Sequence, residues 1–356
     1  MGPHPAVAAV RHAVRRSLAS LSPADLVLVA CSGGPDSLAL AAAAAFEAPR
    51  AGLRAGGIIV DHGLQPGSAE LAVRVAAALT GLGLDPVLLT AVAVPGPEPD
   101  GNGSYPGPEG AARAARYAAL DDAAVSAHAT AVLLGHTLDD QAETVLLGLA
   151  RGSGARSLAG MAERHGKYLR PLLELRRAQT RAACAALGLE PWDDPQNQDP
   201  AFARVRVRHQ LMLALESALG PGTAEALART ARLLRADADV LDDLAAAEAA
   251  RILAADSASA GWPTAALSIL PAAIRHRILR AAALDAGCPP GALAERHISS
   301  LDELVVDWHG QRWTDLPGGV RCQRRYGRLL FTTAEVPGVA SSAGGASRSE
   351  EPGGRE

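Results

Sequence analysis

The sequence predicts an α/β protein with a doubly wound parallel sheet, followed by a smaller, mainly helical domain. Three observations support this fold class. Across residues 1–150, short apolar runs alternate with helical segments, the order expected of βαβ units. The apolar runs are continuous, as in strands that are buried on both faces. Polar residues follow several of these runs at their carboxyl ends, where doubly wound sheets bind their ligands.

The elements of the first domain are delimited by apolar runs and by glycine and proline. An amphipathic helix is expected before the first strand. Segment 95–110 is dense in proline and glycine, which indicates a surface loop. Strands are expected at residues 26–31, 57–60, 86–94 and 131–134, and the helices that follow them at 38–46, 69–82, 111–126 and 139–150.

The second half of the chain is predicted to be helical and to end in a β-hairpin. We place the domain boundary near Gly220-Pro221-Gly222, which gives a first domain of residues 1–220 and a second of 221–334. The tail 335–356 is expected to be disordered because of its composition. Helices are expected at 223–255, 274–286 and 293–306, and the hairpin strands at 311–316 and 320–331.

Composition indicates a soluble globular protein. The chain has 356 residues, of which 48% are hydrophobic and 20% charged. Near the first strand, the longest apolar run is 38–46, far short of the ~20 residues that span a bilayer, so no membrane helix is expected. The 4 cysteines are widely separated and form no CxxC pair. They predict neither a disulfide framework nor a zinc site, and a reducing cytoplasm is the expected location.

Basic residues are concentrated in three segments, although the net charge is −4. Residues 151–181 contain eight lysines and arginines but only two acids. One such cluster is commonly a solvated face, whereas three on an acidic chain favour binding to a polyanion. The other two are the triplet Arg204, Arg206 and Arg208 and the group Arg321, Arg324, Arg325 and Arg328.

The stretch Ser32-Gly33-Gly34-Pro35-Asp36-Ser37 joins the first strand to a helix. Two glycines allow a tight turn and close approach of a ligand, and the helix N-terminus attracts anions. Ser32 and Ser37 add hydroxyl donors. The stretch is neither a Walker loop nor a GxGxxG motif. It predicts a site for phosphate or pyrophosphate, the alternative being an ordinary turn between strand and helix.

Two carboxylates follow the fourth strand. Asp140 and Glu143 are spaced i, i+3, so both can face the same side of one helix. Asp139 is expected to act as a charge at the helix N-terminus. The pair predicts acid–base or cation-binding chemistry, with solvated helix charge as the alternative.

Over these motifs the sequence closely resembles the tRNA(Ile)-lysidine synthetases of the N-type ATP pyrophosphatase, or PP-loop, family. The resemblance covers roughly residues 20–220. One departure is Gln65, where many relatives have arginine. Another is that some members carry an additional C-terminal RNA-binding domain, which leaves the docking of tRNA open here. The matching motifs are SGGPDS at 32–37, VDHGL at 60–64, EGAARAARY at 109–117, GHTLDDQAETVLLGLARGSG at 135–154, RPLL at 170–173, WDDPQN at 192–197 and RVRVRH at 204–209.

The resemblance implies an adenine-nucleotide α-hydrolase-like fold and an ATP-dependent carbon–nitrogen ligase. Free L-lysine would be joined to C2 of the wobble cytidine in the isoleucine tRNA with a CAU anticodon. An adenylated tRNA would be the intermediate, AMP and pyrophosphate would be released, and the product would decode AUA. ATP and Mg²⁺ are the expected cofactors, and the assembly is left open between a monomer and a homodimer.

The resemblance also implies roles for individual residues. The catalytic residues would be Asp36, Asp140, Glu143 and Arg113, with Asp36 near the Mg²⁺. ATP would contact Ser32, Gly33, Gly34, Pro35, Asp36, Ser37, Asp61, His62 and His136. The tRNA would contact Arg116, Arg151, Arg156, Arg204, Arg206 and Arg208.

Two alternatives stay open from the sequence. A tRNA thiolation enzyme would share the glycine loop, but those that use an iron–sulfur cluster or a catalytic cysteine pair need paired cysteines. A non-catalytic adenine-nucleotide binding module would not consume ATP in the presence of tRNA.

Overall fold

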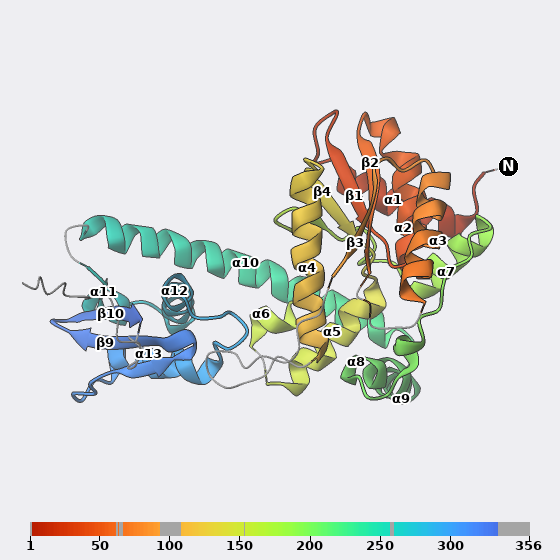
Figure 1. Cartoon of the computed structure of the whole chain (residues 1–356). Coiled ribbons are helices and arrows are strands. Elements are labelled where there is room, and N and C mark those ends of the chain that lie inside the picture. Colours follow the sequence, from red (N-terminus) through yellow and green to blue (C-terminus); the bar gives the residue numbers. More distant parts are fainter. Residues whose placement is uncertain are drawn as a thin grey trace, which may run out of the picture. The chain divides into compact units, whose positions relative to one another are not determined.

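The computed structural model describes residues 2–61, 63, 67–92, 108–152, 154–256 and 260–333 (Figure 1). The chain divides into two compact units, Met1–Leu244 and Ala245–Glu356. Their division lies inside a long helix, α10 (Thr223–Ala255), which begins directly after the expected boundary at Gly220-Pro221-Gly222. The expected disordered tail at 335–356 lies outside the described residues.

The first unit contains a six-stranded sheet with the order β3-β2-β1-β4-β6-β5. All neighbouring strands are parallel except β5 and β6, which form a short antiparallel pair. The strands are β1 (Leu26–Ala30), β2 (Arg54–Asp61), β3 (Val87–Ala91), β4 (Ala131–Leu134), β5 (Arg164–His165) and β6 (Tyr168–Leu169).

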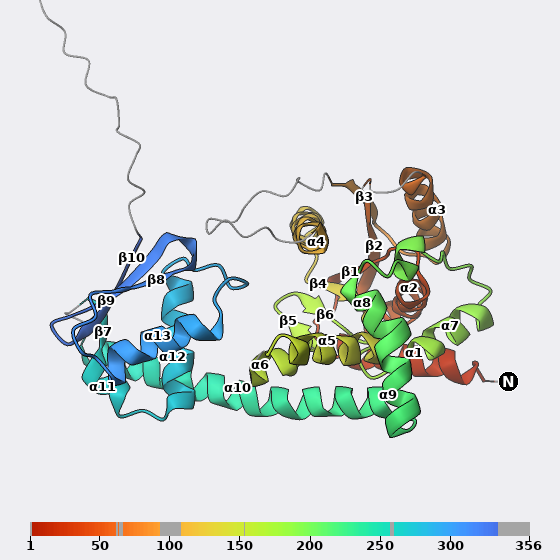
Figure 2. The same cartoon turned by 90° about the horizontal axis from the view of Figure 1, so that it is seen from below.

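Helices cover both faces of this sheet, so the doubly wound fold predicted from the sequence is confirmed (Figure 2). Val27 and Val29 of β1 are buried with α1, α2, α3 and α7, whereas Leu26 and Leu28 are buried with α4 on the opposite face. This alternation follows from the two-residue period of a strand. The helices are α1 (Pro5–Leu18), α2 (Pro35–Glu47), α3 (Ser68–Gly81), α4 (Pro108–Ser126), α5 (Leu138–Ala150), α6 (Ala155–Leu158) and α7 (Arg177–Ala186), with the 3₁₀ turn η1 (Pro49–Ala51) after α2.

The chain after α7 is irregular and then helical. It includes one π-helical turn, a rare conformation that is often found at functional sites. The elements are the 3₁₀ turn η2 (Pro195–Gln198), α8 (Ala203–Arg206), the π-helical turn η3 (Val207–Leu211), α9 (Met212–Leu219) and α10.

The second unit combines helices with a four-stranded antiparallel sheet of order β7-β10-β9-β8. The segment expected as one strand at 320–331 is two strands, because Tyr326 and Gly327 turn the chain with φ of 51° and 71°. The elements are β7 (Trp262–Pro263), α11 (Thr264–Ser268), α12 (Ala272–Asp285), α13 (Glu295–Val306), β8 (Thr314–Leu316), the 3₁₀ turn η4 (Pro317–Gly319), β9 (Val320–Arg325) and β10 (Arg328–Thr333).

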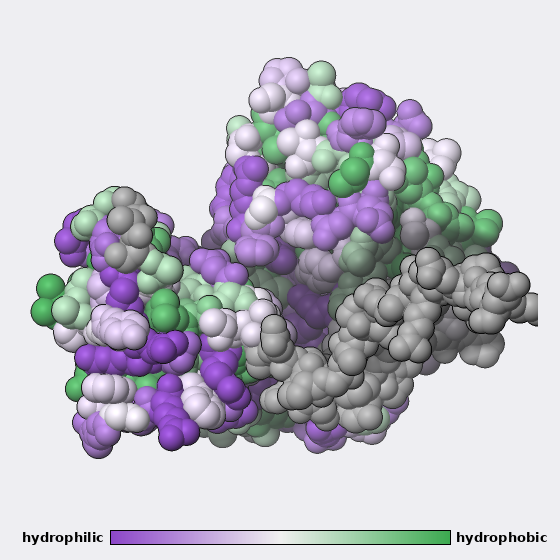
Figure 3. All heavy atoms as spheres, turned by 60° about the vertical axis from the view of Figure 1, so that its left-hand side comes forward, coloured by the Kyte–Doolittle hydropathy of each residue, from purple (hydrophilic) through white to green (hydrophobic). Residues whose placement is uncertain are grey.

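Hydrophilic and hydrophobic residues are interspersed over the face of the molecule that Figure 3 shows. Within the described residues, no helix has both the length and the apolar character needed to cross a membrane.

Candidate active site

The glycine loop between β1 and α2 is closed by its own serines. The amide of Ser32 donates to Oγ of Ser37 at 3.2 Å, and that hydroxyl donates to the carbonyl oxygen of Gly34 at 3.0 Å. The amide of Trp192 donates to the carbonyl oxygen of Gly33 at 2.9 Å and holds the loop from outside. Serine hydroxyls expected to bind phosphate therefore also shape the turn that would receive it.

The two glycines of the loop have different reasons to be glycine. Gly33 has a φ of +84°, and a methyl group there would approach Cγ2 of Val75 to 2.7 Å. The fold itself therefore requires Gly33. Gly34 has a φ of −71°, which any residue adopts, and a methyl group there would meet nothing closer than Oγ of Ser32 at 3.6 Å. A side chain at Gly34 is therefore tolerated by the fold, and we expect the absence of one to serve the approach of a ligand.

The start of α2 fits an anion. Gly34 is the N-cap residue, and no side chain caps the helix there. Pro35 occupies the first turn, where its missing N–H costs nothing. The remaining first-turn amides are left to a ligand, and the helix dipole favours negative charge at this end. The loop residues predicted to contact ATP thus form a cradle suited to phosphate.

Gly135, which the sequence analysis did not single out, fits the end of β4 against the loop. A methyl group at Gly135 would lie 3.2 Å from the backbone C of Asp36 and N of Ser37. The backbone of β4 can approach the loop this closely only without a side chain.

Asp36 lies in the first turn of α2, and its carboxylate faces α7. The hydroxyl of Thr180 donates to Oδ1 of Asp36, and Nε of Arg177 lies 3.5 Å from Oδ2. Burial raises the pKa of the Asp36 carboxyl above its ordinary value, although the Thr180 hydrogen bond and the Arg177 cation oppose the shift. A further cation close to Asp36 would therefore stabilise its ionised form.

Arg177 brings three carboxylates together. Its Nη2 donates to Oδ1 of Asp140 at 2.9 Å and to Oε1 of Glu143 at 3.4 Å, while its Nε faces Asp36. The backbone amide of Arg177 donates to Oδ2 of Asp139 at 2.7 Å, which anchors the start of α7 on α5. Asp36, Asp140 and Glu143, which come from two helices, therefore share one guanidinium.

Asp140 is also fixed by the start of its own helix. Its Oδ2 accepts hydrogen bonds of 2.8 Å from both the amide and the hydroxyl of Thr137, which is the N-cap of α5. Burial opposes ionisation of Asp140, but the Arg177 and Arg204 cations outweigh it and lower the pKa of this carboxyl to about 2. Asp140 is consequently a strong anchor for a cation and a weak proton acceptor.

Glu143 is the most buried acid of the group, with 1% of its surface exposed. Its Oε2 accepts from Nε of Arg204 at 2.9 Å and from Nη2 of Arg208 at 3.1 Å, and its Oε1 accepts from Nε of Arg208 at 2.7 Å. Arg204 and Arg208, predicted to bind tRNA, thus point inward in this structure and pair with the predicted catalytic carboxylate. Asp36, Asp140, Glu143, Arg177, Arg204 and Arg208 are called the acid–arginine cluster below.

Other residues expected near ATP follow the ends of β2 and β4. Oδ1 of Asp61 accepts from the amide of Gly63 at 2.9 Å, whereas His62 and Gln65 lie outside the described residues. His136 is neutral at pH 7, because burial and nearby arginines lower the pKa of its imidazole to about 3. Its Nδ1 is buried and has no hydrogen-bond partner among the described residues. This unpartnered ring nitrogen is suited to a ligand that donates or accepts there.

The remaining predicted arginines are distributed over three places. Arg113 and Arg116 lie on α4, grouped around the ring of Tyr117. Arg156 pairs with Asp239 and Asp242 of α10, which reduces the charge that it offers to RNA. Arg151 and Arg206 are exposed, and Arg206 donates to the carbonyl oxygens of Pro200 and Ala201.

Two residues that contact Asp36 were not predicted. In the sequence, Arg177 is one of the basic residues of segment 151–181, and Thr180 belongs to no motif. Their i, i+3 spacing on α7 was the available signal, since it places both on one helix face. Nothing in the sequence paired that face with Asp36 of α2.

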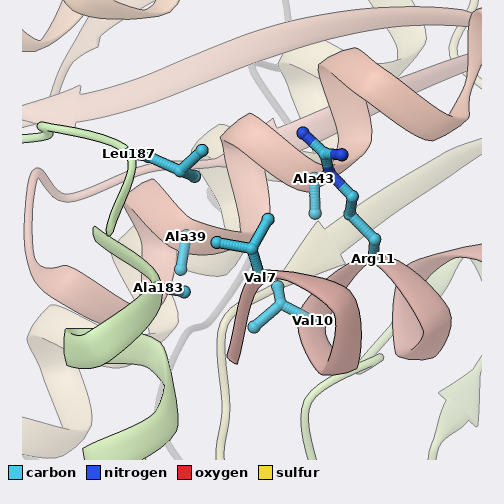
Figure 4. Close-up of a pocket in the computed structure, with 7 residues that line it drawn as sticks. All are labelled: Val7, Val10, Arg11, Ala39, Ala43, Ala183 and Leu187. Atoms are coloured by element: carbon cyan, nitrogen blue, oxygen red, sulfur yellow. The ribbon is translucent and has the colours of Figure 1, made fainter. Parts of the chain in front are cut away.

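A separate hollow lies between α1, α2 and α7 and is not a functional site. Val7, Val10, Ala39 and Ala183 line it with apolar groups, and the enclosed space is too small to hold a water molecule (Figure 4). It is a packing gap in the core.

The thiols near the loop are structural. Cys31 and Cys184 are buried and free, and Sγ of Cys184 donates to the carbonyl oxygen of Pro35 at 3.3 Å. Burial raises the pKa of both thiols, to about 11 for Cys184, so neither is a ready nucleophile. Within the described ranges, no group of three or more His, Cys, Asp or Glu side chains could hold a metal ion.

Comparisons with known proteins agree with this architecture. Residues 8–215 match the PP-loop domain family, and residues 263–330 match the TilS substrate binding domain. A tRNA(Ile)-lysidine synthase of Thermobifida fusca is 57% identical over 331 residues, covering 93% of this chain and 99% of the relative. One of Streptomyces coelicolor is 54% identical over 360 residues, with the same coverage of both chains.

A solved structure is similar in fold over part of this chain. The U34-tRNA thiolase NcsA from Methanococcus maripaludis with its [4Fe-4S] cluster superposes with a TM-score of 0.52 at 19% identity, covering 65% of this chain and 80% of that one. The match shows the PP-loop fold alone. This match and the two domain matches confirm the fold class predicted from the sequence. The domain matches and the relatives also confirm the predicted resemblance: the chain belongs to the tRNA(Ile)-lysidine synthase family, enzymes built on an ATP-binding PP-loop domain.

Proposed function

We propose that this protein ligates free L-lysine to C2 of the wobble cytidine in the isoleucine tRNA with a CAU anticodon, at the expense of ATP. One observation carries the proposal: Asp36, Asp140 and Glu143 meet at Arg177, next to the phosphate cradle of the glycine loop. An amine that must be bound and deprotonated close to an adenylate needs carboxylates in that place.

The chemistry needs two steps. The C2 oxygen of cytidine is a poor leaving group, so it first attacks the α-phosphorus of ATP and pyrophosphate leaves into the glycine loop. The lysine ε-amine then attacks C2, and the oxygen departs with AMP. The net result is one new C–N bond, lysidine, and a tRNA that decodes AUA.

The amine must lose a proton before it attacks. A free lysine side chain with a pKa near 10.4 lies about 3.4 units from neutrality at pH 7, which amounts to roughly 4.6 kcal/mol. Asp140, whose pKa is lowered to about 2, is suited to orient the ammonium rather than to take its proton. We assign the proton to Glu143, which requires Arg204 or Arg208 to leave it when lysine binds. Arg208 lies in the π-helical turn η3, a conformation enriched at functional sites.

Mg²⁺ is expected with the ATP phosphates. This ion takes one or two protein carboxylates and completes its shell with phosphate and water, so Asp36 suffices as its protein ligand. Burial raises the pKa of Asp36, and a bound cation would offset this shift by stabilising the charged carboxylate. Bound there, the ion would neutralise charge on the phosphates.

The same proposal assigns roles to the basic residues and a location to the protein. The basic residues Arg151 and Arg206 would contact the tRNA backbone, and Arg113 would act on the nucleotide. The protein would work in the cytoplasm, as a monomer or a homodimer.

The test is incubation with ATP, labelled lysine and tRNA transcripts. Label should enter the CAU isoleucine tRNA and should not enter the same transcript carrying a GAU anticodon. Release of pyrophosphate should require the CAU transcript. A non-catalytic nucleotide-binding module would bind ATP without either signal, and a thiolation enzyme would need a sulfur donor and no lysine.

A further inference from the structure

A group of arginines around Tyr117 lies outside the acid–arginine cluster. Nη2 of Arg113 lies 3.4 Å and Nη2 of Arg170 lies 3.5 Å from the Tyr117 hydroxyl. The guanidinium carbons of Arg113 and Arg116 lie 5.0 Å and 5.8 Å from the centre of the Tyr117 ring. Three cations from α4 and from the residue after β6 therefore share one aromatic side chain.

These cations have no counter-charge in the described part of the chain. No described carboxylate lies within ion-pair distance of Arg113, Arg116 or Arg170. Arg170 is only 7% exposed. Among the residues that the structure describes, neither Nε of Arg170 nor Nε of Arg116 has a hydrogen-bond partner, and both atoms are buried. Burial of a cation without an anion is costly, so a merely structural role does not account for Arg116 and Arg170. Arg113 is exposed and lies at the edge of the group.

Arg275 of the second unit is a buried arginine with a structural role, and it has both a carboxylate and a carbonyl partner. It is 8% exposed, much as Arg170 is. Its Nε and Nη2 donate to the two carboxylate oxygens of Asp302, at 2.5 Å and 3.0 Å, and its Nη1 donates to the carbonyl oxygen of Leu270. Arg170 has one such carbonyl, that of Ala162 at 2.9 Å, and no carboxylate in the part of the chain that the structure describes.

The lowered pKa of Arg116 also indicates that a negative charge is missing beside this group. Burial lowers the pKa of the Arg116 guanidinium below its ordinary value, and the neighbouring Arg113 and Arg204 cations lower it further. The unpartnered Nδ1 of His136 belongs to the same region, since Arg116 and Arg170 contribute to the low pKa of that imidazole. An anion among these groups would satisfy both the charges and the free N–H donors.

We propose that Arg113, Arg116 and Arg170, grouped around Tyr117, form a second oxyanion site that binds a phosphate group and is distinct from the glycine loop. Guanidinium forks match phosphate oxygens in geometry and charge. The ligand chemistry is a phosphate oxyanion, which ATP and the tRNA backbone both carry. The choice of these two probes rests on the proposed function.

The experiment compares Arg116→Met and Arg170→Met with the matched control Arg164→Met. Arg164 is exposed and lies in β5, next to the strand that precedes Arg170, and its guanidinium donates to the Ser20 hydroxyl at 3.1 Å. ATP binding is measured by equilibrium dialysis. Binding of the tRNA transcript is measured by fluorescence anisotropy at several salt concentrations. Neither measurement needs lysine or turnover. A negative result for the oxyanion site therefore leaves lysidine formation untouched, and a failure of lysidine formation leaves the oxyanion site untouched.

Both test variants should weaken one of the two ligands by roughly tenfold or more, and the control should not. Weaker ATP binding alone assigns the site to a nucleotide phosphate. Weaker tRNA binding, with a salt slope shallower by about 0.7–0.9, assigns it to the RNA backbone. Unchanged binding of both ligands would overturn the proposal.

A second readout separates ligand binding from structure. Because Arg116 has no carboxylate partner among the described residues, Arg116→Met should leave the unfolding temperature of the ligand-free protein unchanged or raised. Arg170→Lys keeps the charge and should retain most of the binding that Arg170→Met loses. A fall of more than about 4 °C in the ligand-free Arg116→Met protein would show a structural role and contradict the site.

Discussion

Nη2 of Arg177 donates a hydrogen bond of 2.9 Å to Oδ1 of Asp140, and this contact joins the start of α7 to the start of α5. Asp140 is 9% exposed, so the pair is largely shielded from water. The same guanidinium reaches Asp36 beside the glycine loop. The phosphate cradle and the carboxylates are therefore linked by one side chain.

Arg177→Met should disorganise the carboxylates. Removal of one partner from a buried ion-pair network typically costs about 3–5 kcal/mol, because the remaining charges stay buried. Lysine incorporation should fall with stability, as measured by urea unfolding and by the labelled-lysine assay. Arg181→Met is the matched control, since Arg181 lies one turn further along α7 and pairs with exposed Asp193. The control should stay within about 0.5 kcal/mol of wild type. Equal effects of the two changes would contradict the role of Arg177.

Gly33→Ala and Gly34→Ala should separate folding from catalysis. Gly33→Ala should lower the unfolding temperature, because its φ of +84° and the contact with Val75 leave no room for a side chain. Gly34→Ala should unfold close to the wild-type temperature yet lose ATP cleavage by about 10², since the added methyl group displaces the bound phosphate. Thermal melts and pyrophosphate release measure the two effects. Full activity in Gly34→Ala would remove the cradle from the mechanism.

His136 should make the protein less stable in acid. Its pKa is lowered from 6.5 to about 3 in the folded state, so below pH 6.5 the unfolded chain binds a proton that the folded chain does not. Stability should therefore fall as pH decreases through this window, by at most about 1.4 kcal/mol per pH unit. His136→Gln should show a shallower decline in urea unfolding midpoints between pH 6.5 and about 4. Parallel declines in the two proteins would contradict the buried neutral imidazole.

The basic residues should divide into two classes when neutralised. Arg151→Gln and Arg206→Gln remove exposed charges and should weaken tRNA binding, with a salt slope shallower by about 0.7–0.9 for each phosphate that is no longer neutralised. Arg204→Gln removes a donor from buried Glu143 and should lower stability instead. Anisotropy titrations at several salt concentrations, together with urea unfolding, measure both effects. An unchanged salt slope for Arg151 and Arg206 would mark them as solvated surface.

The sequence predicted those features that depend on local pattern. The fourth strand at 131–134 and the long helix at 223–255 have the bounds expected from their apolar runs and flanking glycines. The i, i+3 spacing of Asp140 and Glu143 correctly placed both on one helix face, where Arg177 meets them. The turn at Tyr326 was not predicted, because a tyrosine rarely adopts the positive φ that it has between the paired strands β9 and β10.

The arginine partners of the carboxylates could not be predicted in the same way. Arg204 and Arg208 read as one basic patch with Arg206, and only the packing of η3 against α5 directs two of the three inward. Arg177 is 34 residues from Glu143 along the chain, so no periodicity connects them. Such pairings are long-range contacts that a local pattern does not contain.

We propose that Asp140 and Glu143 serve the lysine amine rather than ATP. Both carboxylates meet at Arg177, whose guanidinium also reaches Asp36 beside the glycine loop. The most direct test measures tRNA-dependent pyrophosphate release and lysine incorporation separately in Asp140→Asn and Glu143→Gln, with folding checked by circular dichroism. We expect pyrophosphate release close to wild type and lysine incorporation reduced by about 10² or more. Loss of pyrophosphate release to the same extent, or near-normal rates of both steps, would contradict the account.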